Sequence, residues 1–154
     1  AQTICTKLRS KWTYSMTKSF WKGVVLVSTF ALTSLCFAEY DLSRTLTPQV
    51  SVTGQMDILK FQQLMQQGFK SVIVNRPDQE AGNQVSVSEL RSIAERHHAS
   101  VIYQPMNGQI TQQNIEEFSK YYNELPKPIL MVCRSGTRSA ALYNKAKEQG
   151  LIHE

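Results

Sequence analysis

Short apolar runs alternate with amphipathic stretches along the last two thirds of the chain. Four of these runs are rich in β-branched and aliphatic residues and are too short to favour helices. We therefore expect strands over 50–53, 69–74, 100–103 and 129–132. Between these runs, apolar residues recur every three or four positions, which is typical of helices that bury one face. The alternation predicts an α/β three-layer sandwich with a mainly parallel sheet.

Capping residues indicate where the helices of this sandwich begin. Asp57 is expected to cap the first helix, which Gly68 ends. Ser86 and Glu89 form a capping box for the second. Thr111 starts the third helix, and a fourth begins at Arg138. The inward faces of the first three helices are expected to carry Ile58, Phe61, Leu64, Met65, Leu90, Ile93, Ala94, His97, Ile115, Phe118 and Tyr122.

Loops that follow three of the strands are expected to meet at one edge of the sheet. They span residues 75–78, 104–109 and 133–138. Ligands of open α/β sheets bind outside the carboxyl ends of the strands. This edge is therefore the predicted functional site.

Cys133 ends the last apolar run and stands just before a helix. A thiol in this position faces unpaired N–H groups at the positive end of the helix, which favours the thiolate. The same groups can cradle an anion, and the guanidinium of Arg138 can hold an oxyanion. We predict Cys133 and Arg138 as catalytic residues, with an anion-binding loop that contains Arg134, Ser135, Gly136, Thr137 and Ser139. The alternative is a buried cysteine beside two solvent-facing arginines.

The beginning of the chain has the pattern of a secretory signal peptide. Residues 16–38 place basic residues before an apolar segment and end on small residues at positions 36 and 38. The apolar segment is short for a spanning helix, although an uncleaved anchor is the alternative. We expect residues 1–15 to be upstream or non-native sequence, 39–49 a lead-in, and 50–154 one domain. The mature protein is then bacterial, periplasmic or secreted, and meets a membrane only during export.

Without residues 1–38, the charge balance and the number of cysteines lead to different conclusions. Residues 1–38 hold five basic residues and no acidic one, so 12 basic residues remain against 12 acidic ones. The balance gives no support to a nucleic-acid partner. Cys5 and Cys36 are removed with the leader, which leaves Cys133 without an intramolecular partner. We find no metal-spaced cluster, because the neighbouring His97 and His98 point to different faces, and we expect no cofactor.

Residues from about 50 to 150 resemble the beta-lactamase-hydrolase-like phosphatase-like domain family. The landmarks that carry the resemblance are Gly68 and the runs 72–80, 103–106 and 133–139. The resemblance implies a tyrosine/dual-specificity phosphatase fold, with Cys133 as nucleophile, Arg138 as anion clamp and the backbone of 134–138 as cradle. Some members of the family are named sulfur transferases. Relatives usually continue through another helix, so we expect a truncated C-terminus at Glu154.

Two features depart from a phosphatase of this fold. Only four residues separate Cys133 from Arg138 where a phosphatase loop has five, and the shorter loop has the rhodanese size. The aspartic acid that protonates the leaving oxygen is also missing, because no Asp lies between Tyr103 and Val132. General acid catalysis is typically worth ~10²–10⁴-fold. Asp78, with Arg76 in the neighbouring loop, is the accessory candidate, although a turn residue is the simpler interpretation.

Sulfur transfer does not need a proton donor, because a leaving group such as sulfite is already an anion. The sequence therefore favours a sulfurtransferase that forms a persulfide on Cys133, with a small anionic sulfur donor and a thiol acceptor as partners. The first alternative is a phosphoester hydrolase that forms a phospho-enzyme on Cys133. The second is a non-catalytic module that binds an anion or a protein partner, which a buried and unreactive Cys133 would favour.

Overall fold

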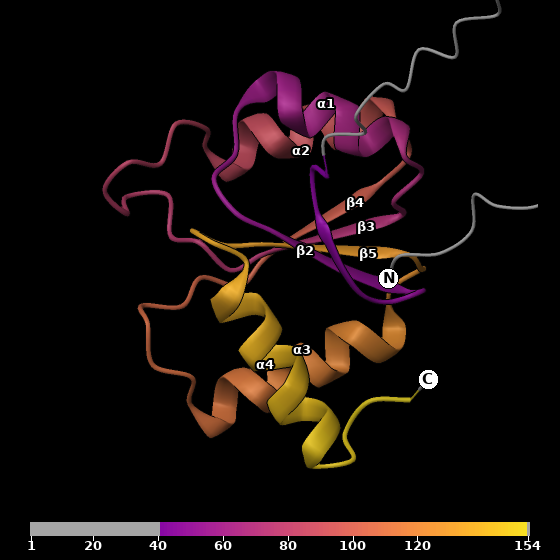
Figure 1. Cartoon of the computed structure of the whole chain (residues 1–154), viewed down its shortest axis with the longest axis vertical. Helices are drawn as coiled ribbons and strands as arrows, with labels where there is room; N and C mark the ends of the chain where they lie inside the picture. The colour runs from indigo at the N-terminus through magenta and orange to yellow at the C-terminus, as the bar shows by residue number, and fades with distance from the viewer. Residues whose placement is uncertain (1–40, 154) are drawn as a thin grey trace, which may run out of the picture. The chain divides into compact units, whose positions relative to one another are not determined.

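The computed structural model describes residues 41–153, which form a five-stranded sheet between two pairs of helices (Figure 1). The strands are β1 (Arg44–Thr47), β2 (Val50–Thr53), β3 (Ser71–Val74), β4 (Ser100–Tyr103) and β5 (Ile129–Val132), in the order β1-β2-β5-β3-β4. The helices are α1 (Ile58–Gln66), α2 (Val87–Arg96), α3 (Gln112–Glu124) and α4 (Thr137–Glu148). Helices α1 and α2 cover one face of the sheet, and α3 and α4 cover the other (Figure 1). The predicted α/β three-layer sandwich is confirmed.

Four of the five strands run parallel, and β5 lies at the centre between β2 and β3. The fifth strand, β1, is an antiparallel edge strand that falls inside the lead-in expected over 39–49. Its register with β2 shifts between Thr45 and Thr47, which marks a bulge. The sequence did not indicate this strand, because Arg44–Thr47 alternates too little between polar and apolar residues to stand out.

The central strands are buried on both faces, as expected for a sheet that helices cover on both sides. Val72 and Val74 of β3 pack toward α1 and α2, whereas Ile73 packs toward α3 and α4. In β5 the same alternation sends Leu130 and Val132 to one core and Ile129 and Met131 to the other. Both faces of β5 are therefore fixed by packing, and the chain leaves this strand at a defined point.

The predicted caps are present. Asp57 Oδ1 accepts the N–H of Lys60 at 2.8 Å, and reciprocal bonds between side chain and backbone join Ser86 to Glu89. The predicted inward position of Ile58 is wrong, because its side chain is 45% exposed. Helix α4 begins at Thr137, one residue before the predicted start, because Gly136 takes the N-cap position.

The signal peptide predicted over 16–38 lies outside the described residues, and so does the segment 1–15. Within residues 41–153, no helix is long and apolar enough to cross a membrane.

Candidate active site

The loop that carries Cys133 begins where the central strand ends. The N–H of Cys133 donates to the Thr53 carbonyl at 3.2 Å, and the N–H of Asn75 donates to the Val132 carbonyl at 2.7 Å. The loop thus leaves the sheet with a neighbouring strand fixed on each side. Two residues after Cys133, Ser135 forms an isolated bridge with Gly54. A methyl group on Gly54 would lie 3.1 Å from the Arg134 carbonyl oxygen, so a larger residue at the end of β2 would press against the backbone of the cysteine loop.

The Cys133 side chain is 1% exposed and lies at the floor of this loop. Its sulfur accepts the N–H of Gly136 at 3.0 Å. Burial alone raises the pKa of the Cys133 thiol. The N–H and hydroxyl of Ser139, with the N–H groups of Ser135 and Gly136, outweigh burial and hold the pKa below its ordinary value. The buried thiol is therefore activated, which argues against the interpretation of Cys133 as an inert core residue.

Hydrogen bonds between buried polar residues connect the surroundings of the sulfur to the neighbouring loops. The Ser139 hydroxyl is 2.9 Å from Asn75 Oδ1, to which it donates, and it also lies within reach of the Cys133 sulfur. One hydroxyl proton serves one acceptor at a time, so Asn75 and the sulfur share it. Asn75 Nδ2 donates in turn to the Gln104 carbonyl at 3.2 Å. The three predicted loops therefore converge through Ser139, Asn75 and Gln104.

Arg138 lies at the mouth of the loop and is already paired. Its Nη1 donates to Glu80 Oε2 at 3.0 Å and to the Met106 carbonyl at 2.8 Å. Both side chains of the ion pair are 18% exposed. The hydrogen bond from Arg138 lowers the pKa of Glu80 below its ordinary value against the effect of burial, and the charges of Arg76 and Arg134 lower it further. At rest, the predicted anion clamp thus holds an ionised carboxylate of the same chain.

Arg76 has a supporting position. It is 3% exposed and donates to Gln55 Oε1 at 2.6 Å and to the Ala81 carbonyl at 3.0 Å. Its Nε lies 3.8 Å from Glu80 Oε1. Arg76 therefore fixes the loop that presents Glu80, and its buried charge favours the ionised carboxylate.

Asp78, the accessory acid candidate, is engaged elsewhere. Its Oδ1 accepts the N–H of Val87 at 2.9 Å at the start of α2, and its own N–H donates to the Tyr103 hydroxyl at 3.0 Å. These bonds place Asp78 as the turn residue of the corner, in agreement with the simpler interpretation of its position in the sequence.

A hollow of about 410 Å³ opens beside the cysteine loop. It is lined by Pro77, Gln79, Glu80, Asn107, Gly108, Arg134 and Arg138. Arg134 is exposed, and so are Ser135 and Thr137, whose hydroxyls lie 3.3 Å apart. Among the residues that line this hollow, Glu80 supplies the carboxylate and two arginines supply positive charge, and none is aromatic. The arrangement suits a small anion better than a flat aromatic group.

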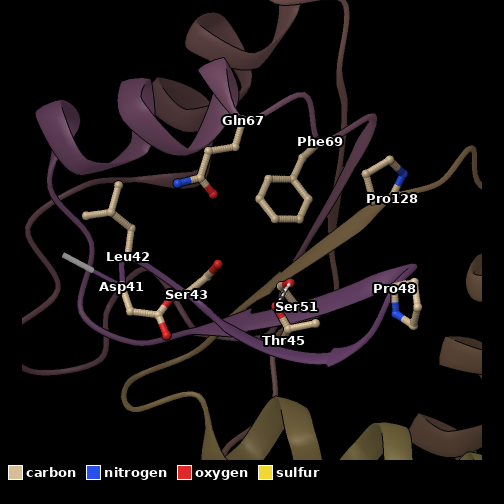
Figure 2. A pocket seen from close by; sticks show the side chains of 9 residues that line it. All are labelled: Asp41, Leu42, Ser43, Thr45, Pro48, Ser51, Gln67, Phe69 and Pro128. Atoms are coloured by element: carbon tan, nitrogen blue, oxygen red, sulfur yellow. Dashed lines mark hydrogen bonds between the residues drawn. The ribbon is translucent and has the colours of Figure 1, made fainter. Parts of the chain in front are cut away.

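A second hollow, of about 600 Å³, lies between the β1–β2 hairpin and the end of α1 (Figure 2). Figure 2 shows the Phe69 ring pointing into it between Gln67 and Pro128. None of its nine lining residues belongs to the cysteine loop. Its only carboxylate is that of Asp41, at the first described residue, and no group in it matches the chemistry of the Cys133 site.

Two site residues, Asn75 and Glu80, were not singled out from the sequence. Both lie in the run 72–80, which carried the family resemblance, but nothing in their spacing indicates that they bind Ser139 and Arg138. Within residues 41–153, no group of three His, Cys, Asp or Glu side chains is placed to hold a metal ion, and Cys133 is the free cysteine.

Comparison with known proteins shows which family and which fold this chain resembles. Residues 41–149 match the family model described as beta-lactamase hydrolase-like protein, phosphatase-like domain. A beta-lactamase hydrolase-like protein of Agrobacterium fabrum is 33% identical over 96 residues, and one of Xylella fastidiosa is 29% identical over the same length. Each match covers 62% of this chain and 22% of the relative, so the chain spans about a fifth of the length of these relatives.

Solved structures show the same fold. A candidate phosphatase of Neisseria meningitidis superposes with a TM-score of 0.64 and 25% identity, over 69% of this chain and 76% of that one. The core catalytic domain of a PP-IP phosphatase of S. cerevisiae superposes with a TM-score of 0.56 and 16% identity. That match covers 70% of this chain and 66% of the yeast domain. The second likeness concerns the fold alone.

Proposed function

Since the chain belongs to the beta-lactamase hydrolase-like, phosphatase-like domain family, we propose that it is a cysteine-dependent phosphoester hydrolase. The observation that carries the proposal is the convergence of three backbone N–H groups, those of Ser135, Gly136 and Ser139, on the Cys133 sulfur, with Arg138 in the first turn of α4. A loop that stabilises a thiolate in this way can also hold the oxygens of a phosphoryl group.

The proposed reaction has two steps. In the first, the Cys133 thiolate attacks phosphorus, the Sγ–P bond forms, and the bond from phosphorus to the leaving oxygen breaks. In the second, water attacks phosphorus, the Sγ–P bond breaks, and phosphate leaves with the thiolate restored. The backbone of residues 134–138 and the guanidinium of Arg138 stabilise the charge on the phosphoryl oxygens in both steps.

This proposal reverses the preference drawn from the sequence, which favoured sulfur transfer. The family is described as phosphatase-like, and the Neisseria protein is described as a candidate phosphatase at 25% identity. Both descriptions support phosphoester chemistry on the Cys133 loop. The curated relatives are much longer than this chain. Phosphoester hydrolysis by the whole protein is therefore part of the proposal.

One observation supports sulfur transfer as the second candidate function. Four residues separate Cys133 from Arg138, and a loop of this size accommodates a terminal persulfide sulfur. In this reaction Cys133 would take a sulfane sulfur from a small anionic donor such as thiosulfate. It would then pass the sulfur to a thiol acceptor.

The experiment that separates the two compares one preparation on both reactions. We expect hydrolysis of 4-nitrophenyl phosphate by the wild type and none by Cys133→Ser. Acid quenching should trap a gain of one phosphoryl group on Cys133 in the intact mass. Sulfur transfer from thiosulfate to cyanide, with a gain of one sulfur atom and no hydrolysis, would instead establish the second candidate.

A further inference from the structure

The cysteine loop has a nucleophile and an anion clamp, but no aspartic acid follows β4 to protonate a leaving oxygen. Asp78 does not fill this role, because its carboxylate caps the start of α2. A hydrolase of unactivated phosphoesters still requires a proton for the alkoxide that leaves. The question is which carboxyl group of the described residues can approach the phosphoryl site.

Glu80 meets this requirement by position. It comes from the loop after β3, lines the 410 Å³ hollow together with Arg134 and Arg138, and contacts Arg138 directly. Its other oxygen, Oε1, is buried, has no hydrogen-bond donor, and lies 3.8 Å from Arg76 Nε. The carboxyl group is therefore held at the wall of the hollow, beside the arginine that would bind the phosphoryl group.

We infer that Glu80 is the general acid of the reaction and takes the place of the missing aspartate. The inference rests on the proposed phosphoester hydrolysis. As the Sγ–P bond forms and the bond from phosphorus to the leaving oxygen breaks, Glu80 gives its proton to that oxygen and becomes a carboxylate. In the second step the carboxylate takes a proton from the attacking water, which returns Glu80 to its protonated form. When phosphate leaves and Arg138 pairs with Glu80 again, this proton passes to solvent.

The ion pair with Arg138 determines when Glu80 carries a proton. Without substrate, the guanidinium groups of Arg138, Arg76 and Arg134 keep Glu80 ionised and its pKa low. A phosphoryl group that binds Arg138 replaces Oε2 as the partner of the guanidinium and brings negative charge of its own. Both changes favour the protonated carboxyl, so Glu80 takes up a proton from solvent when the anion binds.

Substrates with different leaving groups test this assignment. Glu80→Gln keeps an acceptor for Arg138 but cannot supply a proton. We expect it to reduce kcat/KM for a phosphoserine peptide by ~10²-fold or more, the usual worth of general acid catalysis. For 4-nitrophenyl phosphate, whose leaving group needs no proton, we expect little change. Glu95→Gln, the same substitution on the exposed surface of α2, serves as the matched control.

Each other outcome has a definite meaning. An equal loss on both esters would make Glu80 a positioning residue for Arg138 and overturn the assignment alone. A selective loss in Asp78→Asn rather than Glu80→Gln would make Asp78 the acid. Hydrolysis of neither ester by wild-type protein with an alkylatable Cys133 would overturn the proposed function itself.

A binding measurement checks the proton uptake without turnover. Sulfate is a dianion that does not titrate near neutral pH, and Cys133→Ser removes the thiol as a competing proton acceptor. Calorimetric titration of sulfate in buffers of different ionisation enthalpy should show proton uptake by Cys133→Ser and none by Cys133→Ser/Glu80→Gln. Equal uptake by both proteins would contradict the role of Glu80.

Discussion

Ser139 links the reactivity of the cysteine to the buried network behind it. Ser139→Ala removes the hydroxyl and keeps the N–H, so the sulfur loses one of the groups that hold the Cys133 pKa below its ordinary value. We expect the pH midpoint of iodoacetamide alkylation to move upward. Ser135→Ala is the control, because the Ser135 hydroxyl faces Thr137 and only its N–H serves the sulfur. A midpoint that stays in place in Ser139→Ala would remove the hydroxyl from the thiolate site.

Arg138 is the residue whose shape should matter as much as its charge. Its Nη1 donates to the Met106 carbonyl as well as to Glu80, so the guanidinium keeps its position when an anion takes the place of the Glu80 carboxylate. Arg138→Lys retains the charge but not the planar fork. We expect kcat/KM for 4-nitrophenyl phosphate to fall by ~10²-fold. Arg134→Lys, at an exposed position of the same loop, should have a smaller effect, and equal effects would contradict the clamp.

The placement of Cys133 and Arg138 in one loop between a strand and a helix could be predicted, because strand, cysteine, glycine, arginine and helix follow one another in the sequence. The position of Glu80 could not, because its contact with Arg138 joins residues that are 58 positions apart. The contact of Asn75 with Ser139 could not be predicted either, since this hydrogen bond depends on β3 and β5 being neighbours. Local patterns predict which side chains a loop carries, but only the order of the strands shows which residues of other loops these side chains contact.

At the scale of elements, the turn from β5 into α4 depends on the left-handed backbone of Gly136, whose φ is 83°. Gly150, just after the end of α4, has a similar φ of 67° and lies in open space. An alanine at either position is strained by about 1–2 kcal/mol. We expect Gly136→Ala and Gly150→Ala to lower the free energy of unfolding by similar amounts in urea titrations.

Only one of these two variants should change the chemistry. The N–H of Gly136 donates to the Cys133 sulfur, whereas Gly150 has no part in the loop. Alanine keeps this N–H, but strain at φ 83° shifts it away from the sulfur, so Gly136→Ala should slow alkylation of Cys133 at neutral pH, and Gly150→Ala should not. Equal alkylation rates in the two variants would show that the turn does not depend on this glycine.

The elements themselves were largely predictable, and the exceptions have physical causes. Apolar periodicity placed four strands and four helices because each buries a continuous face. Strand β1 was missed because an edge strand with exposed and half-buried residues lacks that signal. Ile58 was assigned inward by its spacing, yet as the first residue of α1 it is 45% exposed, and burial on this helix begins at Phe61.

At the scale of the whole molecule, we propose that the domain works outside the cytoplasm after its leader is removed. The motivation is the small residues at positions 36 and 38 behind an apolar segment. We expect the mature N-terminus at or near Glu39. N-terminal sequencing of protein from the extracytoplasmic fraction would check this, and a full-length band retained in the membrane fraction would contradict cleavage.

The bulge in β1 has a consequence for how copies of the domain meet. An edge strand offers unpaired N–H and C=O groups to any other chain, and a flat, regular edge invites aggregation. Where the register of β1 shifts between Thr45 and Thr47, this ladder is interrupted and the strand twists more strongly. Strand β1 is therefore a poor template for a sixth strand from a neighbouring molecule, and the sheet ends at this strand.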